Sequence, residues 1–137
     1  MNAVFLDRDG TINVGIPRIS RVDSPEKVEL LPTVIEALSL LATLDYKVFL
    51  VTNQAGIAEG KITVKEFEKI NERTLELIKP SGIEITETYY CPHGEQDACE
   101  CKKPKPKMLF DAAEKYDLDL ENSFMIGDRI SDIDTGV

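Results

Sequence analysis

The sequence predicts an α/β fold, with a mainly parallel sheet and helices packed against it. Short apolar runs alternate along the chain with segments whose apolar residues recur at helical spacing, which is typical of βαβ units. Most of the apolar runs are nearly continuous, as in strands that are buried on both faces. The 137 residues are enough for one hydrophobic core and too few for two. We therefore expect a single domain over residues 1–137.

Four segments are expected to form the strands of this sheet. They are Ala3–Leu6, Lys47–Val51, Ile83–Tyr90 and Ser123–Ile126. The first two and the last are the continuous apolar runs, so they are expected to be buried on both faces.

Three helices are expected between the strands. Pro32 suits the first turn of a helix, whose apolar face would comprise Val34, Ile35, Leu38, Leu41 and Leu44. Thr63 and Glu66 have the spacing of a capping box at the start of the second. Pro106 suits the start of the third, whose inward face would comprise Met108, Leu109, Ala112, Ala113 and Tyr116.

Composition and charge narrow the class of protein. The net charge of −9 disfavours a nucleic-acid partner, because such proteins neutralise phosphates with basic side chains. No apolar run approaches the roughly 20 residues that span a bilayer, and the first residues do not resemble a signal peptide. We expect a cytoplasmic monomer without a membrane or nucleic-acid partner.

Polar residues follow the carboxyl ends of the expected strands. Asp7 and Asp9 follow the first strand, Thr52 and Asn53 the second, and Asp128 the last. The carboxyl ends of parallel strands lie at one edge of a sheet, where ligands bind in α/β proteins. These side chains are therefore expected to meet in one site.

The pair Asp7 and Asp9 indicates a metal site. Alternation in an extended segment would direct both carboxylates to one side and Arg8 to the other. Two adjacent carboxylates repel each other unless a cation lies between them, and oxygen ligands favour Mg²⁺. Gly10 allows a sharp turn after the pair. The alternative is an ordinary Asp-rich turn, since Asp and Gly favour turns for their own reasons.

The polar residues that follow the other expected strands are consistent with the same site, and each also has a simpler explanation. Asp128 would complete the metal site, and Asp132, one helical turn later, would face the same pocket. An acidic helix N-terminus is the alternative. Thr52 and Asn53 could donate to phosphate oxygens or cap a helix. The basic run 102–107 could offset phosphate charge or lie in solvent.

A second metal site is indicated by Cys91, His93, Cys99 and Cys101. Three thiolates and one imidazole within eleven residues complete a tetrahedral zinc site, and a site without an open position is structural. Zinc would order the loop 91–101 and place the following lysines at the pocket. The alternatives are free cysteines, or a small zinc module that binds nucleic acid, which the net charge disfavours.

Four motifs together resemble those of haloacid-dehalogenase-superfamily phosphatases. They are DRDGT at 7–11, VTN at 51–53, KKP at 102–104 and GDRISD at 127–132. They occur in the order of the family, and the resemblance covers nearly the whole chain. It implies a three-layer Rossmann-like fold and hydrolysis of phosphate monoesters.

The resemblance also implies a role for each matching residue. Asp7 would be the nucleophile that takes the phosphoryl group, and Asp9 the acid for the leaving alkoxide and then the base for water. Thr52 and Lys103 would bind phosphoryl oxygens. Mg²⁺ would be held by Asp7, by the backbone carbonyl of Asp9 and by Asp128. Asn53 and Lys102 would also contact phosphate. The remaining motif residues would support the site without a direct part in the reaction: Gly10, Thr11, Arg129 and Asp132.

The zinc loop narrows the resemblance to a branch without a cap domain. That branch contains heptose-1,7-bisphosphate phosphatases and histidinol-phosphate phosphatases. Segments 52–61, 89–91 and 103–106 resemble the heptose type, which predicts removal of the 7-phosphate. Two positions depart from it: Lys102 stands where arginine is usual, and Lys107 where glycine is common. A histidinol-phosphate phosphatase and a non-catalytic zinc-containing binding protein are the alternatives.

Two further expectations concern the access to the site and the end of the chain. Residues 12–30 would form a flap over the site, which suits a small phosphorylated metabolite rather than a large partner. Family members continue beyond residues 132–137 through a helix and another strand. The C-terminal strand is therefore expected to be missing, and the strand at 123–126 to lie at an open edge.

Overall fold

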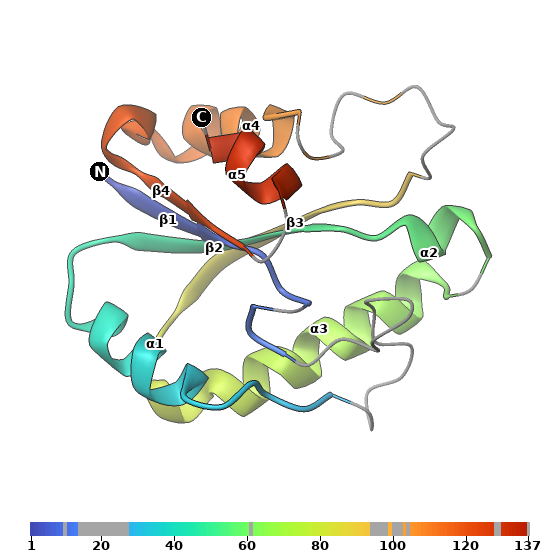
Figure 1. Ribbon diagram of the computed structural model, residues 1–137, viewed down its shortest axis with the longest axis horizontal. Helices are drawn as coiled ribbons and strands as arrows, with labels where there is room; N and C mark the ends of the chain where they lie inside the picture. The colour runs from blue at the N-terminus through green and yellow to red at the C-terminus, as the bar shows by residue number, and fades with distance from the viewer. Residues whose placement is uncertain are drawn as a thin grey trace.

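The fold is a four-stranded parallel sheet in the order β3-β2-β1-β4 (Figure 1). The computed structural model describes residues 1–9, 11–13, 28–60, 62–93, 99, 103, 105–127 and 130–136. The strands are β1 (Ala3–Leu6), β2 (Lys47–Asn53), β3 (Ile85–Cys91) and β4 (Phe124–Ile126). The α/β class and the parallel sheet are confirmed. Because β2 and β4 flank β1 on opposite sides, the strand order reverses at β1, which is where ligands bind in such sheets.

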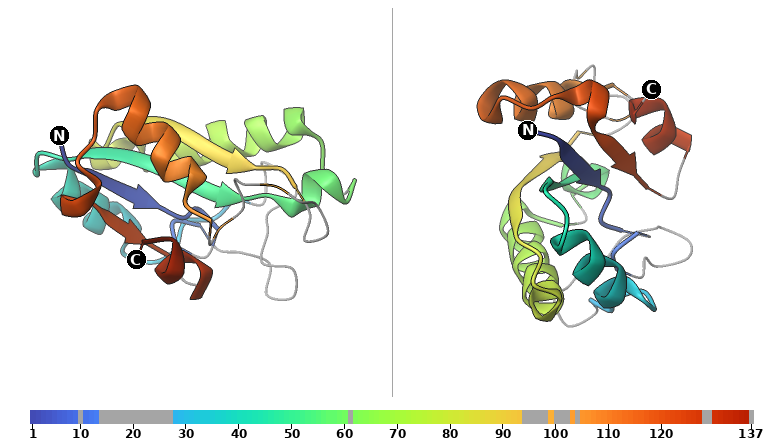
Figure 2. Two further views of the ribbon diagram at one scale, coloured as in Figure 1. Left: turned by 90° about the horizontal axis from the view of Figure 1, so that it is seen from above. Right: turned by 90° about the vertical axis from the view of Figure 1, so that its left-hand side faces the viewer.

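Helices cover both faces of the sheet and make three layers (Figure 2). One face carries α1 (Val34–Ala42) and α3 (Val64–Ile78), and the other carries α4 (Lys107–Tyr116) and α5 (Ile130–Gly136). The short helix α2 (Ala55–Ala58) follows the end of β2. Two 3₁₀ turns, Lys79–Ser81 and Leu120–Asn122, precede β3 and β4.

The two faces of the sheet have separate cores. Phe5 and Phe49 stack with ring centroids 5.4 Å apart on the face that α4 covers with Met108. Leu6, from the opposite face of β1, packs with Leu38 of α1. Burial on both faces is the physical reason why β1 and β2 are continuous apolar runs in the sequence. The same expectation was wrong for β4, where Phe124 and Ile126 are exposed because this strand lies at the edge of the sheet.

Local signals set the ends of the helices. The capping box of α3 is confirmed: the Glu66 backbone N–H donates to Thr63 Oγ1 at 3.0 Å, and the Thr63 N–H donates to Glu66 Oε1 at 2.9 Å. The expected apolar face of the first helix was wrong at Leu44, which is exposed beyond the end of α1. Thr43 ends that helix, because both its N–H and its hydroxyl donate to the Leu40 carbonyl.

The bounds of β2 and β3 differ from the expected ones. The Ile83 N–H donates to the Ser81 hydroxyl, after a left-handed turn at Gly82, so β3 begins only at Ile85. At the other end Asn53 pairs with Cys91, which extends both strands. This extension brings the end of β2 beside the start of the expected zinc loop.

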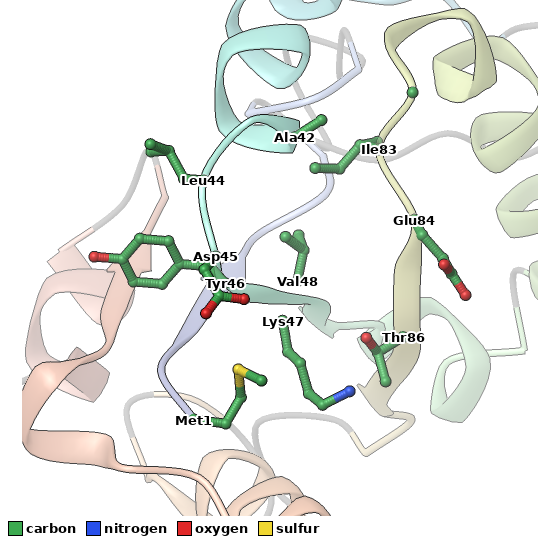
Figure 3. Close-up of a pocket in the computed structure, with 11 residues that line it drawn as sticks. Met1, Ala42, Leu44, Asp45, Tyr46, Lys47, Val48, Ile83, Glu84 and Thr86 are labelled. Atoms are coloured by element: carbon green, nitrogen blue, oxygen red, sulfur yellow. The ribbon is translucent and has the colours of Figure 1, made fainter.

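A cavity of about 440 Å³ lies at the amino ends of the strands (Figure 3). It is lined by residues that include Met1, Lys47, Ile83 and Thr86, and the Lys47 side chain extends toward Thr86. This cavity is at the opposite edge of the sheet from the predicted site. No helix among the described residues is long and apolar enough to cross a membrane.

Candidate active site

The carboxyl edge of the sheet brings the predicted residues together. Asp7 directly follows β1, and its N–H donates to the carbonyl of Ile126 at the end of β4. Thr52 and Asn53 end β2, and Cys91 ends β3. The sheet therefore gathers residues that are far apart in the sequence into one region, as the parallel arrangement predicts.

Lys103 lies between two carboxylates at this edge. Its ammonium donates to Asp7 Oδ1 at 3.0 Å, to Asp132 Oδ1 at 2.5 Å and to the Val51 carbonyl at 3.2 Å. All three N–H donors of the ammonium are thus used. The side chains of Lys103, Asp7 and Asp132 are almost fully buried. Two buried carboxylates need such a cation, because unpaired charge in a protein interior is costly.

Gly127 lets Asp132 approach this cluster. Asp132 lies on α5, which begins shortly after β4. A Cβ atom at Gly127 would collide with the Asp132 carboxyl group. Only glycine leaves room for that close approach. The glycine of the GDRISD segment therefore has a packing function in addition to ending the strand.

Asp9 is paired with Arg8, contrary to the expectation that Arg8 points away. Arg8 Nε donates to Asp9 Oδ1 at 3.0 Å, and Nη2 donates to Asp9 Oδ2 at 3.2 Å. Alternation was the wrong rule because β1 ends at Leu6. The N–H groups of Thr11, Ile12 and Asn13 all bond to the Arg8 carbonyl, so the chain turns here instead of extending.

Gln54 is a site residue that the sequence analysis missed. Its Nε2 donates to Asp9 Oδ2 at 3.2 Å and to Thr52 Oγ1 at 2.9 Å. The Gln54 side chain therefore connects the expected acid to an expected phosphate ligand. Its position directly after the VTN motif was the available signal, but a glutamine there has no chemistry of its own to single it out.

Asn53 binds the backbone of Lys103. Its Nδ2 donates to the Lys103 carbonyl at 3.3 Å, and its Oδ1 accepts from the Lys103 N–H at 3.0 Å. The amide thus pairs with both polar groups of one residue, as a neighbouring strand would. The structure places Asn53 where it fixes the backbone of Lys103, and its predicted contact with phosphate stays a prediction.

Cys91, His93 and Cys99 form a compact group. Cys91 Sγ lies 3.4 Å from His93 Nδ1 and 3.7 Å from Cys99 Sγ. Around a tetrahedral zinc ion, with Zn–S of about 2.3 Å and Zn–N of about 2.0 Å, such pairs lie about 3.5 Å and about 3.8 Å apart. The three ligand atoms all lie within 4.8 Å of one another. The geometry therefore fits a zinc ion.

Two lines of contact join this group to the active site. The Gln54 N–H donates to the Cys91 carbonyl at 2.8 Å, and the Ala58 N–H donates to the Pro92 carbonyl at 3.1 Å. Lys105 Nζ donates to the Cys99 carbonyl at 2.7 Å. The start and the later part of the loop are thereby tied to segments next to the residues of the candidate site.

Several predicted residues lie outside the described part of the chain. They are Gly10, Cys101, Lys102, Asp128 and Arg129, with most of the expected flap. Thr11 is described, and its buried hydroxyl has no hydrogen-bond partner within the described part of the chain. Their roles stay predictions.

Comparison with known proteins identifies the family of this chain. The model of the family described as haloacid dehalogenase-like hydrolase matches residues 18–137. A D-glycero-β-D-manno-heptose-1,7-bisphosphate 7-phosphatase of Helicobacter pylori is 41% identical over 136 residues, which are 98% of this chain and 76% of that protein. The α-anomer counterpart of Campylobacter jejuni is 38% identical, with coverage of 98% and 76%.

The structural comparison agrees. The crystal structure of D,D-heptose 1,7-bisphosphate phosphatase from B. bronchiseptica, complexed with magnesium and phosphate, has a TM-score of 0.90. It is 33% identical and covers 98% of this chain and 74% of its own. The predicted resemblance is thereby confirmed. With the carboxylate and lysine cluster at the carboxyl edge of its parallel sheet, this chain belongs to the haloacid dehalogenase-like hydrolase family and is a phosphatase.

Proposed function

We propose that the protein removes the 7-phosphate of D-glycero-D-manno-heptose 1,7-bisphosphate through an aspartyl-phosphate intermediate. The observation that carries the chemistry is the buried contact of Asp7 with Lys103, backed by Asp132. The names of the relatives support the choice of substrate.

Each residue of the site has a task in two displacements. In the first, a carboxylate oxygen of Asp7 forms a bond to phosphorus while the ester oxygen leaves, and Asp9 gives that oxygen a proton. In the second, Asp9 takes a proton from water as the water oxygen attacks phosphorus. The Asp7 carboxylate is then the leaving group, and inorganic phosphate is released. Thr52 and Lys103 would hold the phosphoryl oxygens throughout.

The charges of the site fit a magnesium ion. Among the described residues, three carboxylates (Asp7, Asp9 and Asp132) face only two cations, Arg8 and Lys103. An anionic substrate would meet net negative charge here, and oxygen ligands suit Mg²⁺. Asp7, the Asp9 carbonyl and Asp128 would hold the ion. When bound, it supplies positive charge next to the phosphoryl oxygens.

We propose zinc as the structural ion of the loop, held by the three described ligands and by Cys101. Stripping zinc with a chelator, followed by excess Mg²⁺, is expected to lower the melting temperature by at least about 5 °C. Phosphate release should fall at least about tenfold, because the loop leads into Lys103.

Zinc content and thermal melting of stripped and zinc-reloaded protein are the measurements for this prediction. Reloading with Zn²⁺ should restore both properties, and further Mg²⁺ alone should restore neither. A protein that melts at the same temperature with and without zinc would contradict the structural role.

Phosphate release with Mg²⁺ from heptose 1,7-bisphosphate and from histidinol phosphate tests the substrate. We expect kcat/KM to be at least about 100-fold higher for the sugar, since the relatives named above are all heptose-bisphosphate phosphatases. Asp7→Asn is the blank, and both anomers are assayed because the relatives differ in anomer. A preference for histidinol phosphate would replace the proposed substrate and keep the mechanism. Zinc-loaded, folded protein that releases no phosphate from either would favour a non-catalytic binding protein.

A further inference from the structure

The Asp9 carboxylate is held by three donors from two directions. Arg8 supplies Nε and Nη2, one to each oxygen, and Gln54 supplies Nε2 to Oδ2 at 3.2 Å. The general acid of a two-step phosphatase must serve the leaving oxygen in one step and water in the next. Its orientation therefore affects both steps.

Arg8 is a fixed partner. Its side chain is 0% exposed, and its guanidinium carbon lies 5.1 Å from the centroid of the Phe67 ring. Phe67 in turn packs on Tyr90, with ring centroids 4.4 Å apart. The buried Nη1 of Arg8 has no hydrogen-bond partner among the residues that the structure describes. Contact with an aromatic face compensates a guanidinium for part of this loss. Arg8 therefore presents a rigid fork to Asp9.

Gln54 is a partner of a different kind, because it binds two site residues with one nitrogen. The two hydrogens of Nε2 go to Asp9 Oδ2 and to Thr52 Oγ1, which are 3.2 Å and 2.9 Å away. The Gln54 side chain is 3% exposed, so water does not compete freely for these bonds. The amide thus sets the spacing between the acid and the phosphoryl-binding hydroxyl.

The bond to Thr52 also has a direction. Thr52 Oγ1 accepts from Gln54, so its own hydrogen stays available for donation. Its alternative acceptor, the Asn53 carbonyl, lies at 3.4 Å, which is long for a hydroxyl donor. The Thr52 hydroxyl is thereby prepared to donate to a phosphoryl oxygen.

We propose that Gln54 is a positioning residue that holds the Asp9 carboxyl group on the leaving-group side of the phosphoryl site. This inference rests on the proposed function, since it takes Asp9 as the general acid. Losing the amide would remove the bond to Thr52 as well as the bond to Asp9. The loss at Thr52 should affect every phosphate ester alike, whereas the loss at Asp9 should affect the esters whose leaving oxygen needs a proton.

The test is the dependence of kcat/KM on the leaving group. An alkyl phosphate needs its oxygen protonated as it leaves, whereas nitrophenyl phosphate releases a stable anion without that proton. Gln54→Leu should lower kcat/KM for both substrates, because both lose the bond that orients Thr52, and the loss should be at least about tenfold larger for the alkyl substrate than for nitrophenyl phosphate. Gln54→Glu should do the same, since it replaces the donor with a carboxylate that repels Asp9. A series of aryl phosphates should give a steeper dependence on leaving-group pKa in both variants.

A matched control removes the same kind of bond elsewhere. Asn71 Nδ2 donates to Thr88 Oγ1 at 3.0 Å between α3 and β3. Asn71→Leu should change stability and leave the leaving-group dependence unchanged. Circular dichroism and thermal melting establish that each variant is folded.

The outcomes separate this inference from the proposed function. Folded Gln54 variants that lose equal activity on both substrates, or none, would overturn the inference. In that case Asp9→Asn would still show the leaving-group effect if the mechanism holds. Wild-type protein that hydrolyses neither substrate would overturn the proposed function itself.

Discussion

Replacing Asp7 by Asn is expected to lower phosphate release at least about a thousandfold, as removal of a nucleophile does in enzymes that use covalent catalysis. The amide has nearly the shape of the carboxylate but cannot form the mixed anhydride with phosphate. Asp7 is buried and bonded to Lys103, so the carboxylate is already held in place before substrate arrives. The measurement is phosphate release with Mg²⁺, together with mass spectrometry of acid-quenched enzyme.

Wild-type enzyme quenched during turnover should carry a phosphoryl group on the peptide that contains Asp7, and the variant should not. Asp111→Asn is the matched control, because it also removes a lysine–aspartate pair, here an exposed one with Lys107 at 2.7 Å. It should retain activity. A folded Asp7→Asn protein that turns over at the wild-type rate would rule out the aspartyl-phosphate route.

Lys103→Met is expected to damage both catalysis and stability. The substitution keeps the length of the side chain and removes the cation that lies between Asp7 and Asp132. Breaking a buried ion pair by removing one partner costs about 3–5 kcal/mol, because the remaining charges stay buried without compensation. Activity should fall with stability, since the ammonium would also offset charge on the phosphoryl oxygens. Urea unfolding and kcat/KM measure the two effects.

A double variant separates these effects. Asp132→Asn added to Lys103→Met removes one of the two stranded carboxylates, which should recover at least about 1 kcal/mol of the lost stability. Activity should not recover, because no cation has been restored. A double variant no more stable than Lys103→Met would show that the two residues are not energetically coupled.

The sequence predicted the sheet well because its signals are local. The continuous apolar runs marked three strands, of which β1 and β2 are buried on two faces and β4 is not, and Thr63 with Glu66 marked the start of α3. The position of the site followed from topology alone, since Asp7 and Thr52 both lie at strand carboxyl ends.

The details of the site depend on contacts that no local pattern encodes. The bond between Asn53 and Lys103 joins residues 50 apart, and the bond between Gln54 and Asp9 joins residues 45 apart. The prediction that Arg8 points away from Asp9 was wrong for another reason. The chain leaves the extended conformation after Leu6, and the alternation rule holds only within a strand. Side-chain partners such as these require the fold before they can be assigned.

The separation of these partners along the chain has a consequence for folding during synthesis. Lys103 and Asp7 are 96 residues apart, and the Ala3 N–H bonds to Ser123 across 120 residues. The central strand β1 is synthesised before β4, so one of its edges stays unpaired until β4 has been made. Contacts of such long range close late, because the entropy of a large loop is lost before they form. During synthesis Asp7 therefore precedes both Lys103 and Asp132, and the charged cluster can form only after the segments that carry these two residues have packed against the sheet.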